Sequence, residues 1–238
     1  MPRKHLIASG INKKQQQQSK IWMKCAREIK AAVKVGGPNP EANPRLKAAI
    51  VRALQNNLSR DSIQRNISGA DKDAASLKEV TYEGRGPKGL AIIVKALTDN
   101  EQRTISAVRG YFSKLHGEIS KPNSAMILFD EHGQIIIEKT ADLTEDKILE
   151  TVLDFDVVDL RQDETAFELL VTPETFFDAK QALEDAGIAI AEADVKLIPN
   201  STVDITEEEN EKLERFIEQC EDDDDVQWVV TNLGDILD

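Results

Sequence analysis

Residues 134–160, QIIIEKTADLTEDKILETVLDFDVVDL, change their apolar period twice and so decide the fold of this part of the chain. A strand is predicted at 134–138, and a helix follows the N-cap Thr144, because its apolar residues recur at helical spacing. A strand at 156–160, a strand at 166–171, a helix at 172–187 and a strand at 194–198 follow. This β-α-β-β-α-β order is typical of a ferredoxin-like α+β domain.

The segments on either side of residues 131–199 show a similar order of elements. Strands are predicted at 90–97, 124–129, 202–205 and 226–231, with helices at 100–116 and 207–220. Asp130-Glu131-His132-Gly133 predicts a hairpin turn between two strands. Thr206 with Glu209 predicts a capping box for the last helix. We therefore expect a discontinuous α+β domain, 77–130 plus 200–238, with a ferredoxin-like domain, 131–199, inserted in it.

The N-terminal part has a helical rather than a strand period. Residues 1–15 are polar and basic and are predicted to form a flexible tail. A basic helical domain is predicted at 16–70, with helices at 16–35, from Pro44, and from Ser59 to Gly69. The apolar stripe of the first helix includes Trp22, which is expected to face the core. The fold class is thus α+β: a three-helix N-terminal domain followed by two ferredoxin-like α+β domains, one inserted in the other.

Charge is distributed unevenly along the chain. The net charge is −13, yet the residues up to Asn66 include fourteen Lys and Arg residues against three acidic ones. A basic N-terminal part on an acidic remainder favours a polyanionic partner for the basic part. The alternative interpretation is that the two parts attract each other. The acidic run Asp222–Asp225 is interpreted as a solvated loop rather than a cation site.

The remaining composition argues against several functional classes. No apolar run approaches the ~18 residues that a membrane helix needs, and no secretory apolar segment follows the N-terminus. The two cysteines and three histidines show neither metal-ligand spacing nor a catalytic arrangement. We therefore expect a cytoplasmic protein that is not an enzyme, with no cofactor, no metal, no small-molecule substrate and no membrane contact.

The basic residues of the first two helices are the candidate nucleic-acid contacts, since closely spaced phosphates can meet several of them at once. They are Lys13, Lys14, Lys20, Lys24, Arg27, Lys30, Lys34, Arg45, Lys47 and Arg52. The glycines and prolines between the two helices predict a stiff, shaped loop. Its candidate functional residues are Gly36, Gly37, Pro38, Asn39, Pro40 and Asn43.

Six motifs stand out along the chain, from about residue 20 to the C-terminus. They are Gly36-Gly37-Pro38-Asn39-Pro40, Asn43-Pro44-Arg45-Leu46, Thr81-Tyr82-Glu83-Gly84 with Gly86-Pro87 and Gly89, Leu97-Thr98-Asp99-Asn100 with Arg103-Thr104, Ile198-Pro199-Asn200, and Asp225-Val226-Gln227. In this order they resemble the YebC/PmpR family, whose mitochondrial relatives activate translation of cytochrome c oxidase subunit I. The opening departs from the family's usual His-Ser-Lys-Trp start and looks like the YeeN branch.

The resemblance implies a three-domain, non-enzymatic protein. Members are described as DNA-binding transcriptional regulators, while others act in translation, on the ribosome, easing synthesis of proline-rich stretches. We therefore expect a nucleic-acid-binding regulator of gene expression, with DNA as the first target. The alternatives are a ribosome-associated translation factor that binds ribosomal RNA, and an acidic protein-interaction scaffold.

Overall fold

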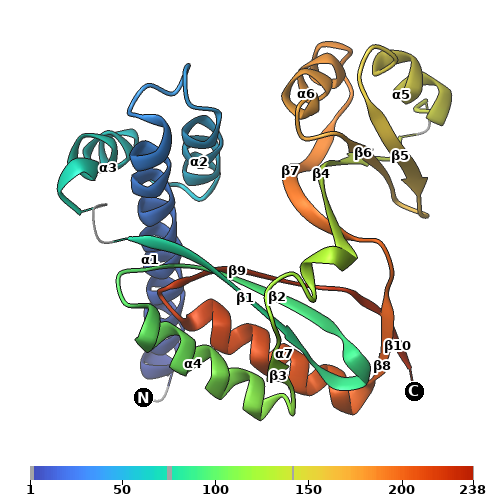
Figure 1. Cartoon of the computed structure of the whole chain (residues 1–238). Helices are drawn as coiled ribbons and strands as arrows, with labels where there is room; N and C mark the ends of the chain where they lie inside the picture. Colours follow the sequence, from blue (N-terminus) through green and yellow to red (C-terminus); the bar gives the residue numbers. More distant parts are fainter. Residues whose placement is uncertain (1–2, 74–76, 141, 238) are drawn as a thin grey trace. The chain divides into compact units, whose positions relative to one another are not determined.

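The computed structural model describes residues 3–73, 77–140 and 142–237, and their side chains from residue 18 on apart from 71–73. The chain forms two compact units. Unit 1 joins Met1–Ala125 to Val203–Asp238, and unit 2 comprises Met126–Thr202. Helices and antiparallel sheets follow a helical N-terminal part, which confirms the predicted α+β class (Figure 1).

Three helices make up the N-terminal part of unit 1: α1 (Arg3–Gly36), α2 (Pro44–Gln55) and α3 (Arg60–Asp73). Ile29 and Ala32 of α1, Leu46 of α2 and Ile63 of α3 pack together in one apolar cluster. Regular 3.6-residue spacing places these residues on the inner faces of the helices.

Helix α1 begins earlier than the sequence predicts. It starts at Arg3, so the expected helix start at 16 is wrong and residues 3–15 of the expected tail are helical, while residues 1–2 lie outside the described residues. Residues 3–18 contain no proline and one glycine, and Lys, Gln, Leu and Ala favour a helix. Polar composition alone was therefore a poor indicator of disorder here.

Trp22 does not face the core as expected. Its side chain is 37% exposed, and its indole N–H donates to the carbonyl of Asn56, just after α2, at 2.9 Å. The apolar cluster on α1 begins at Cys25, one turn later. Trp22 thus covers the end of α2 and leaves part of its ring in solvent.

The rest of unit 1 is a four-stranded antiparallel sheet with two helices on one face (Figure 1). Its strands are β1 (Lys78–Arg85), β2 (Ala91–Thr98), β3 (Glu118–Ile119) and β9 (Val226–Thr231), in the order β3-β1-β2-β9. The helices α4 (Glu101–Lys114) and α7 (Glu207–Asp222) meet through Phe112 and Phe216, whose ring centroids are 4.9 Å apart. Thr206 and Glu209 form the predicted capping box of α7.

The remaining short elements complete unit 1 and lead into unit 2. Two 3-10 turns lie at Pro87–Gly89 and Met126–Leu128, and β8 (Val203–Thr206) pairs in parallel with β10 (Leu233–Leu237). The predicted strand at 124–129 is absent from the described residues, because the segment turns. The carboxylate of Glu83 accepts the backbone N–H groups of Asn123 and Ala125, at 2.7 and 2.8 Å, where a strand would need a neighbouring strand.

Unit 2 has the predicted β-α-β-β-α-β order. Its elements are β4 (Phe129–Glu138), α5 (Glu145–Thr151), β5 (Val157–Gln162), β6 (Ala166–Val171), α6 (Phe176–Asp185) and β7 (Ile190–Pro199). The antiparallel sheet has the order β5-β6-β4-β7, and α5 and α6 pack against its apolar side. This is a ferredoxin-like arrangement.

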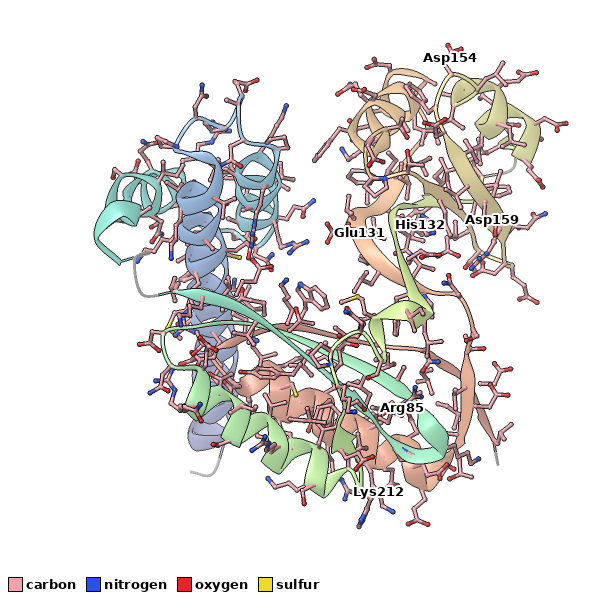
Figure 2. All side chains as sticks on the ribbon, viewed as in Figure 1. Arg85, Glu131, His132, Asp154, Asp159 and Lys212 are labelled. Atoms are coloured by element: carbon pink, nitrogen blue, oxygen red, sulfur yellow. The ribbon has the colours of Figure 1, made fainter. Side chains whose placement is uncertain are left out.

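The predicted hairpin turn at 130–133 is wrong. These residues lie inside β4, which pairs with β7 from Phe129 onward, and Figure 2 shows Glu131 and His132 along that strand. Gly133 serves packing rather than a turn, since a Cβ there would lie 2.6 Å from the ring of Phe176. A glycine beside polar residues can thus indicate a close contact as well as a turn.

Candidate nucleic-acid interface

Arg27 of α1 contacts the acidic segment after α7 rather than solvent. Its guanidinium donates to the carboxylate of Asp225 at 2.7 Å, and also to the carbonyls of Leu97 and Asp224. The side chain of Asp225 is only 6% exposed. The interpretation of 222–225 as a solvated loop is therefore wrong for Asp225.

Asp225 is the centre of a buried polar cluster that joins four elements. It accepts hydrogen bonds from Arg103 at 2.6 Å, Thr104 at 2.9 Å and Thr98 at 3.1 Å, besides that from Arg27. Burial alone would raise the pKa of Asp225, but these hydrogen bonds outweigh it and hold the pKa below its ordinary value. The carboxylate therefore stays ionised and fixes α1 against β2, α4 and β9.

Lys20 and Lys24, on the preceding turns of α1, contact the acidic end of α7. The ammonium of Lys20 lies 2.8 Å from a carboxylate oxygen of Asp222, and that of Lys24 lies 2.7 Å from the carbonyl of Glu221. Burial lowers the pKa of Lys24, although the neighbouring acidic residues act to raise it. These two cations and Arg27 thus form an acid-facing side of α1.

The remaining cations of α1 lie elsewhere on that helix. Lys34 is exposed and donates to the carbonyl of Leu77 at 3.1 Å, while Lys30 is half-buried. Lys13 and Lys14 belong to α1, but their side chains lie outside the described residues. The cations of α1 predicted to contact phosphates therefore fall into two groups: three that face acidic residues near the end of α7, and others that lie elsewhere on the helix.

Helix α2 presents its cations differently. Arg45 is held by Glu28 at 2.9 Å and by Glu79 at 2.7 Å, whereas Lys47 and Arg52 are exposed on a helix that contains no acidic residue. Arg60 and Arg65 of α3 are exposed as well. Neither arginine is among the nucleic-acid contacts predicted from the sequence, although the count of basic residues up to Asn66 includes both.

Asn43 fixes the loop between α1 and α2. Its side-chain oxygen accepts the N–H of Leu46 at 3.0 Å, and its nitrogen donates to the carbonyls of Ala32 and Gly37, each at 2.9 Å. The residue is 3% exposed, and a Cβ on Gly36 would lie 2.6 Å from it. One side chain therefore caps the start of α2 and the end of α1 together.

The rest of the loop is held in one shape while its tip stays exposed. Gly37 has φ +81°, a conformation that glycine adopts without strain, and Asn39 accepts the N–H of Glu41 at 3.1 Å. Pro38 and Asn39 are exposed, Pro40 is half-buried, and Val35 is 76% exposed beside them. Hydrogen bonds thus hold the base of the loop, and its tip offers a small apolar and amide surface.

Other classes of site find little support in the described part of the chain. Among those residues, no group of three or more His, Cys, Asp or Glu side chains is placed to hold a metal ion. Cys25 and Cys220 are free and buried, and burial raises the pKa of the Cys220 thiol to about 12. No described helix is long and apolar enough to cross a membrane.

Comparison with known proteins assigns the family. The model of the N-terminal domain of TACO1/YebC proteins matches residues 2–73, and that of their second and third domains matches residues 77–233. The chain is 63% identical to a probable transcriptional regulatory protein of Ureaplasma urealyticum and 54% identical to one of Malacoplasma penetrans, with all of each chain covered.

More distant relatives agree. A probable transcriptional regulatory protein of Clostridium tetani is 38% identical over 96% of this chain and 94% of its own. The crystal structure of a conserved hypothetical protein of Aquifex aeolicus, 35% identical, matches with a TM-score of 0.78 over 93% of this chain and 92% of that one. The chain therefore belongs to the TACO1/YebC family.

Proposed function

We propose that this chain binds nucleic acid through its helical domain and regulates gene expression, as a DNA-binding transcriptional regulator. The observation on which this rests is the exposure of Lys47 and Arg52 on α2, a helix with no acidic residue. The names of the relatives, probable transcriptional regulatory proteins, agree with this class of function. Exposed Lys and Arg neutralise phosphates and release their counterions, which favours binding.

The phosphate contacts fall on α2 and α3 in this proposal. Lys20, Lys24 and Arg27 already have anionic or carbonyl partners within the chain, so they would have to exchange one partner for another. Lys47, Arg52, Arg60 and Arg65 are all exposed on α2 and α3, so a phosphate can reach their charged groups from solvent. Lys30 and Lys34 of α1 belong to the same helical domain and are further candidate phosphate contacts.

The salt dependence of binding tests this proposal. Four phosphate contacts give a slope of log K against log salt of about −3.6, and a loss of about 150-fold in affinity between 50 and 200 mM salt. The measurement uses the full chain and a duplex DNA labelled for fluorescence anisotropy. Lys47→Glu with Arg52→Glu should reduce both affinity and slope, while Lys212→Glu on α7 serves as the control. Affinity that does not depend on salt would contradict the proposal.

The second candidate is a translation factor that binds ribosomal RNA. The observation that favours it is the loop at 36–43, whose shape Asn43 fixes while Pro38 and Asn39 remain exposed. A fixed, exposed loop beside cations suits insertion into a folded RNA, which proteins recognise by shape. Co-sedimentation with ribosomes, combined with weaker binding to duplex DNA than to ribosomal RNA, would favour this candidate over the first.

A further inference from the structure

The strand β1 has one edge that the sheet leaves largely open. On one side β1 pairs with β2 along its whole length, from Lys78 to Arg85. On the other side β3 pairs only with Gly84 and Arg85. Among the described residues no strand lies beside the first six residues of β1. Proteins usually cover such an edge, because its unpaired backbone groups are a template for another strand.

The direction of the backbone groups identifies the free positions. The N–H of Ser120 donates to the carbonyl of Glu83 at 2.8 Å, so the backbone of Glu83 faces the β3 side. Backbone groups alternate along a strand, hence those of Thr81 face the same side while those of Tyr82 face β2. In the described part of the chain the N–H and carbonyl of Thr81 have no hydrogen-bond partner on that side. The chain leaves the edge after Ser120, at Lys121 and Pro122.

A groove of about 740 Å³ runs along this edge. Thr81, Tyr82 and Glu83 form one side of it, and α4 and residues 117–122 form the rest (Figure 1 shows α4 beside β1). The apolar lining residues are Ile105, Phe112, Ile119 and Pro122. The free edge therefore adjoins an apolar surface on which side chains of an added strand could pack.

Two cations give the groove a charge preference. Arg109 of α4 and Lys121 line it, both are exposed, and neither has an ion pair among the described residues. Glu83 also lines the groove, but its carboxylate already accepts two backbone N–H groups. Glu118, at the β3 end, is the remaining acidic lining residue. The groove thus favours an anionic side chain near Arg109 and Lys121.

We propose that this groove binds an extended acidic peptide of a partner protein, which adds a strand to the open edge of β1. The peptide exchanges backbone hydrogen bonds with Thr81, packs an apolar side chain against Ile105 and Phe112, and places a carboxylate beside Arg109 and Lys121. Strand addition suits these features because backbone bonds supply affinity and the lining side chains supply specificity. This surface is separate from the helical domain, so the inference does not depend on nucleic-acid binding.

The first test is selection from a displayed library of random heptapeptides on the full, immobilised chain. We expect the selected peptides to lack proline at their centre and to contain at least one acidic residue. A selected peptide is then measured by fluorescence anisotropy, alongside the same peptide N-methylated at alternate residues. N-methylation removes the N–H groups that pair with β1 and leaves the protein intact, and we expect at least a tenfold loss of affinity.

Variants of the chain locate the peptide. Thr81→Pro removes the outward N–H at an edge position, where proline is tolerated, and should weaken binding about tenfold. Arg109→Glu with Lys121→Glu should weaken it by a similar factor at 50 mM salt, and by less at high salt. Arg215→Glu on α7 is the matched control, because Arg215 is an exposed helical arginine outside the groove. Thermal unfolding of each variant shows whether the fold is retained.

Three outcomes would overturn the proposal: selection that enriches no peptide, binding that N-methylation leaves unchanged, or an equal effect of Arg215→Glu. A fourth outcome would also overturn it: short single-stranded RNA binds at Arg109 and Lys121, and the selected peptide does not displace this RNA. That result would identify the groove as a polyanion site instead.

Discussion

The cations of α1 and α2 have a similar density in the sequence, but two groups of them, one on each helix, differ in their surroundings in the structure. Lys20 and Lys24 contact the acidic end of α7 and Arg27 contacts the acidic residues just after it, whereas Lys47 and Arg52 are exposed on a helix without acidic residues. A row of basic residues can therefore hold an acidic part of the same chain or meet an external polyanion. Whether basic residues form a structural contact or a binding surface therefore depends on what they contact, and not on how many they are.

The largest effect, a loss of stability, is expected from Asp225→Ala, which removes the contact between Arg27 of α1 and the buried carboxylate. The change removes the carboxylate that Arg27, Arg103 and two threonines share, so each of these donors loses one acceptor. Breaking a buried ion pair from one side costs about 3 kcal/mol. Both tryptophans, Trp22 and Trp228, belong to unit 1, so their fluorescence in a denaturant titration reports unfolding of this unit.

Asp224→Ala is the control for that measurement. Asp224 is exposed and contacts Arg27 through its backbone carbonyl, which the substitution retains. We expect a change of less than about 0.5 kcal/mol, typical of surface positions. Equal losses for the two variants would mean that the segment acts through its total charge and not through the buried carboxylate.

The second prediction concerns the α2 side. Lys47→Glu with Arg52→Glu should weaken binding to duplex DNA about 100-fold at low salt, through two lost contacts and two repulsive charges. Lys20→Glu with Lys24→Glu should weaken binding less, because those cations already have partners within the chain. Anisotropy titrations of both variants measure the difference. The reverse order would place the phosphate contacts on α1.

The third prediction concerns how the contribution of the Asp225 carboxylate to stability depends on pH. Its pKa is lower in the folded chain than in an unfolded one, because the bonds from its four donors outweigh burial. A depressed pKa contributes stability above the unfolded-state pKa, about 3.9, and this contribution is lost as pH falls through the folded-state pKa. The stability difference between wild type and Asp225→Asn should therefore shrink as pH is lowered below about 4. A difference that stays constant down to pH 2 would contradict it.

Much of the fold followed from local patterns in the sequence. The ferredoxin-like order of unit 2 is encoded by apolar periods and by caps such as Thr144, which accepts the N–H of Lys147 as predicted. The errors arose where a distant contact decides the local structure. Glu83 bonds the backbone of the 123–125 turn in place of a strand, and Phe176 packs on Gly133 in place of a hairpin turn.

The candidate site could be predicted less completely, for the same reason. The basic character of α1 and α2 and the stiffness of the loop were evident from residue types. The pairing of Arg27 with Asp225 joins residues 198 positions apart, and no local pattern indicates it. A usable signal was nevertheless present, since Arg103 and Asp225 both belong to motifs that the resemblance singled out. Two separated motifs of opposite charge can indicate one buried contact.

The smallest effect is expected from Asp222→Asn. This change tests whether a cation of α1 can bind nucleic acid once its acidic partner within the chain is removed. Asp222 is 72% exposed and its bond to Lys20 is a surface ion pair, so stability should change by less than about 1 kcal/mol. The substitution removes the charged partner of Lys20 and keeps its bond to the backbone carbonyl of residue 222, so affinity for duplex DNA should rise about two- to threefold at low salt. Asp235→Asn, on β10, removes the same charge far from α1 in the sequence and controls for net charge. If only Asp222→Asn strengthens binding, the acidic segment competes with nucleic acid for α1, whereas equal gains would assign the effect to long-range repulsion and leave α1 a structural helix.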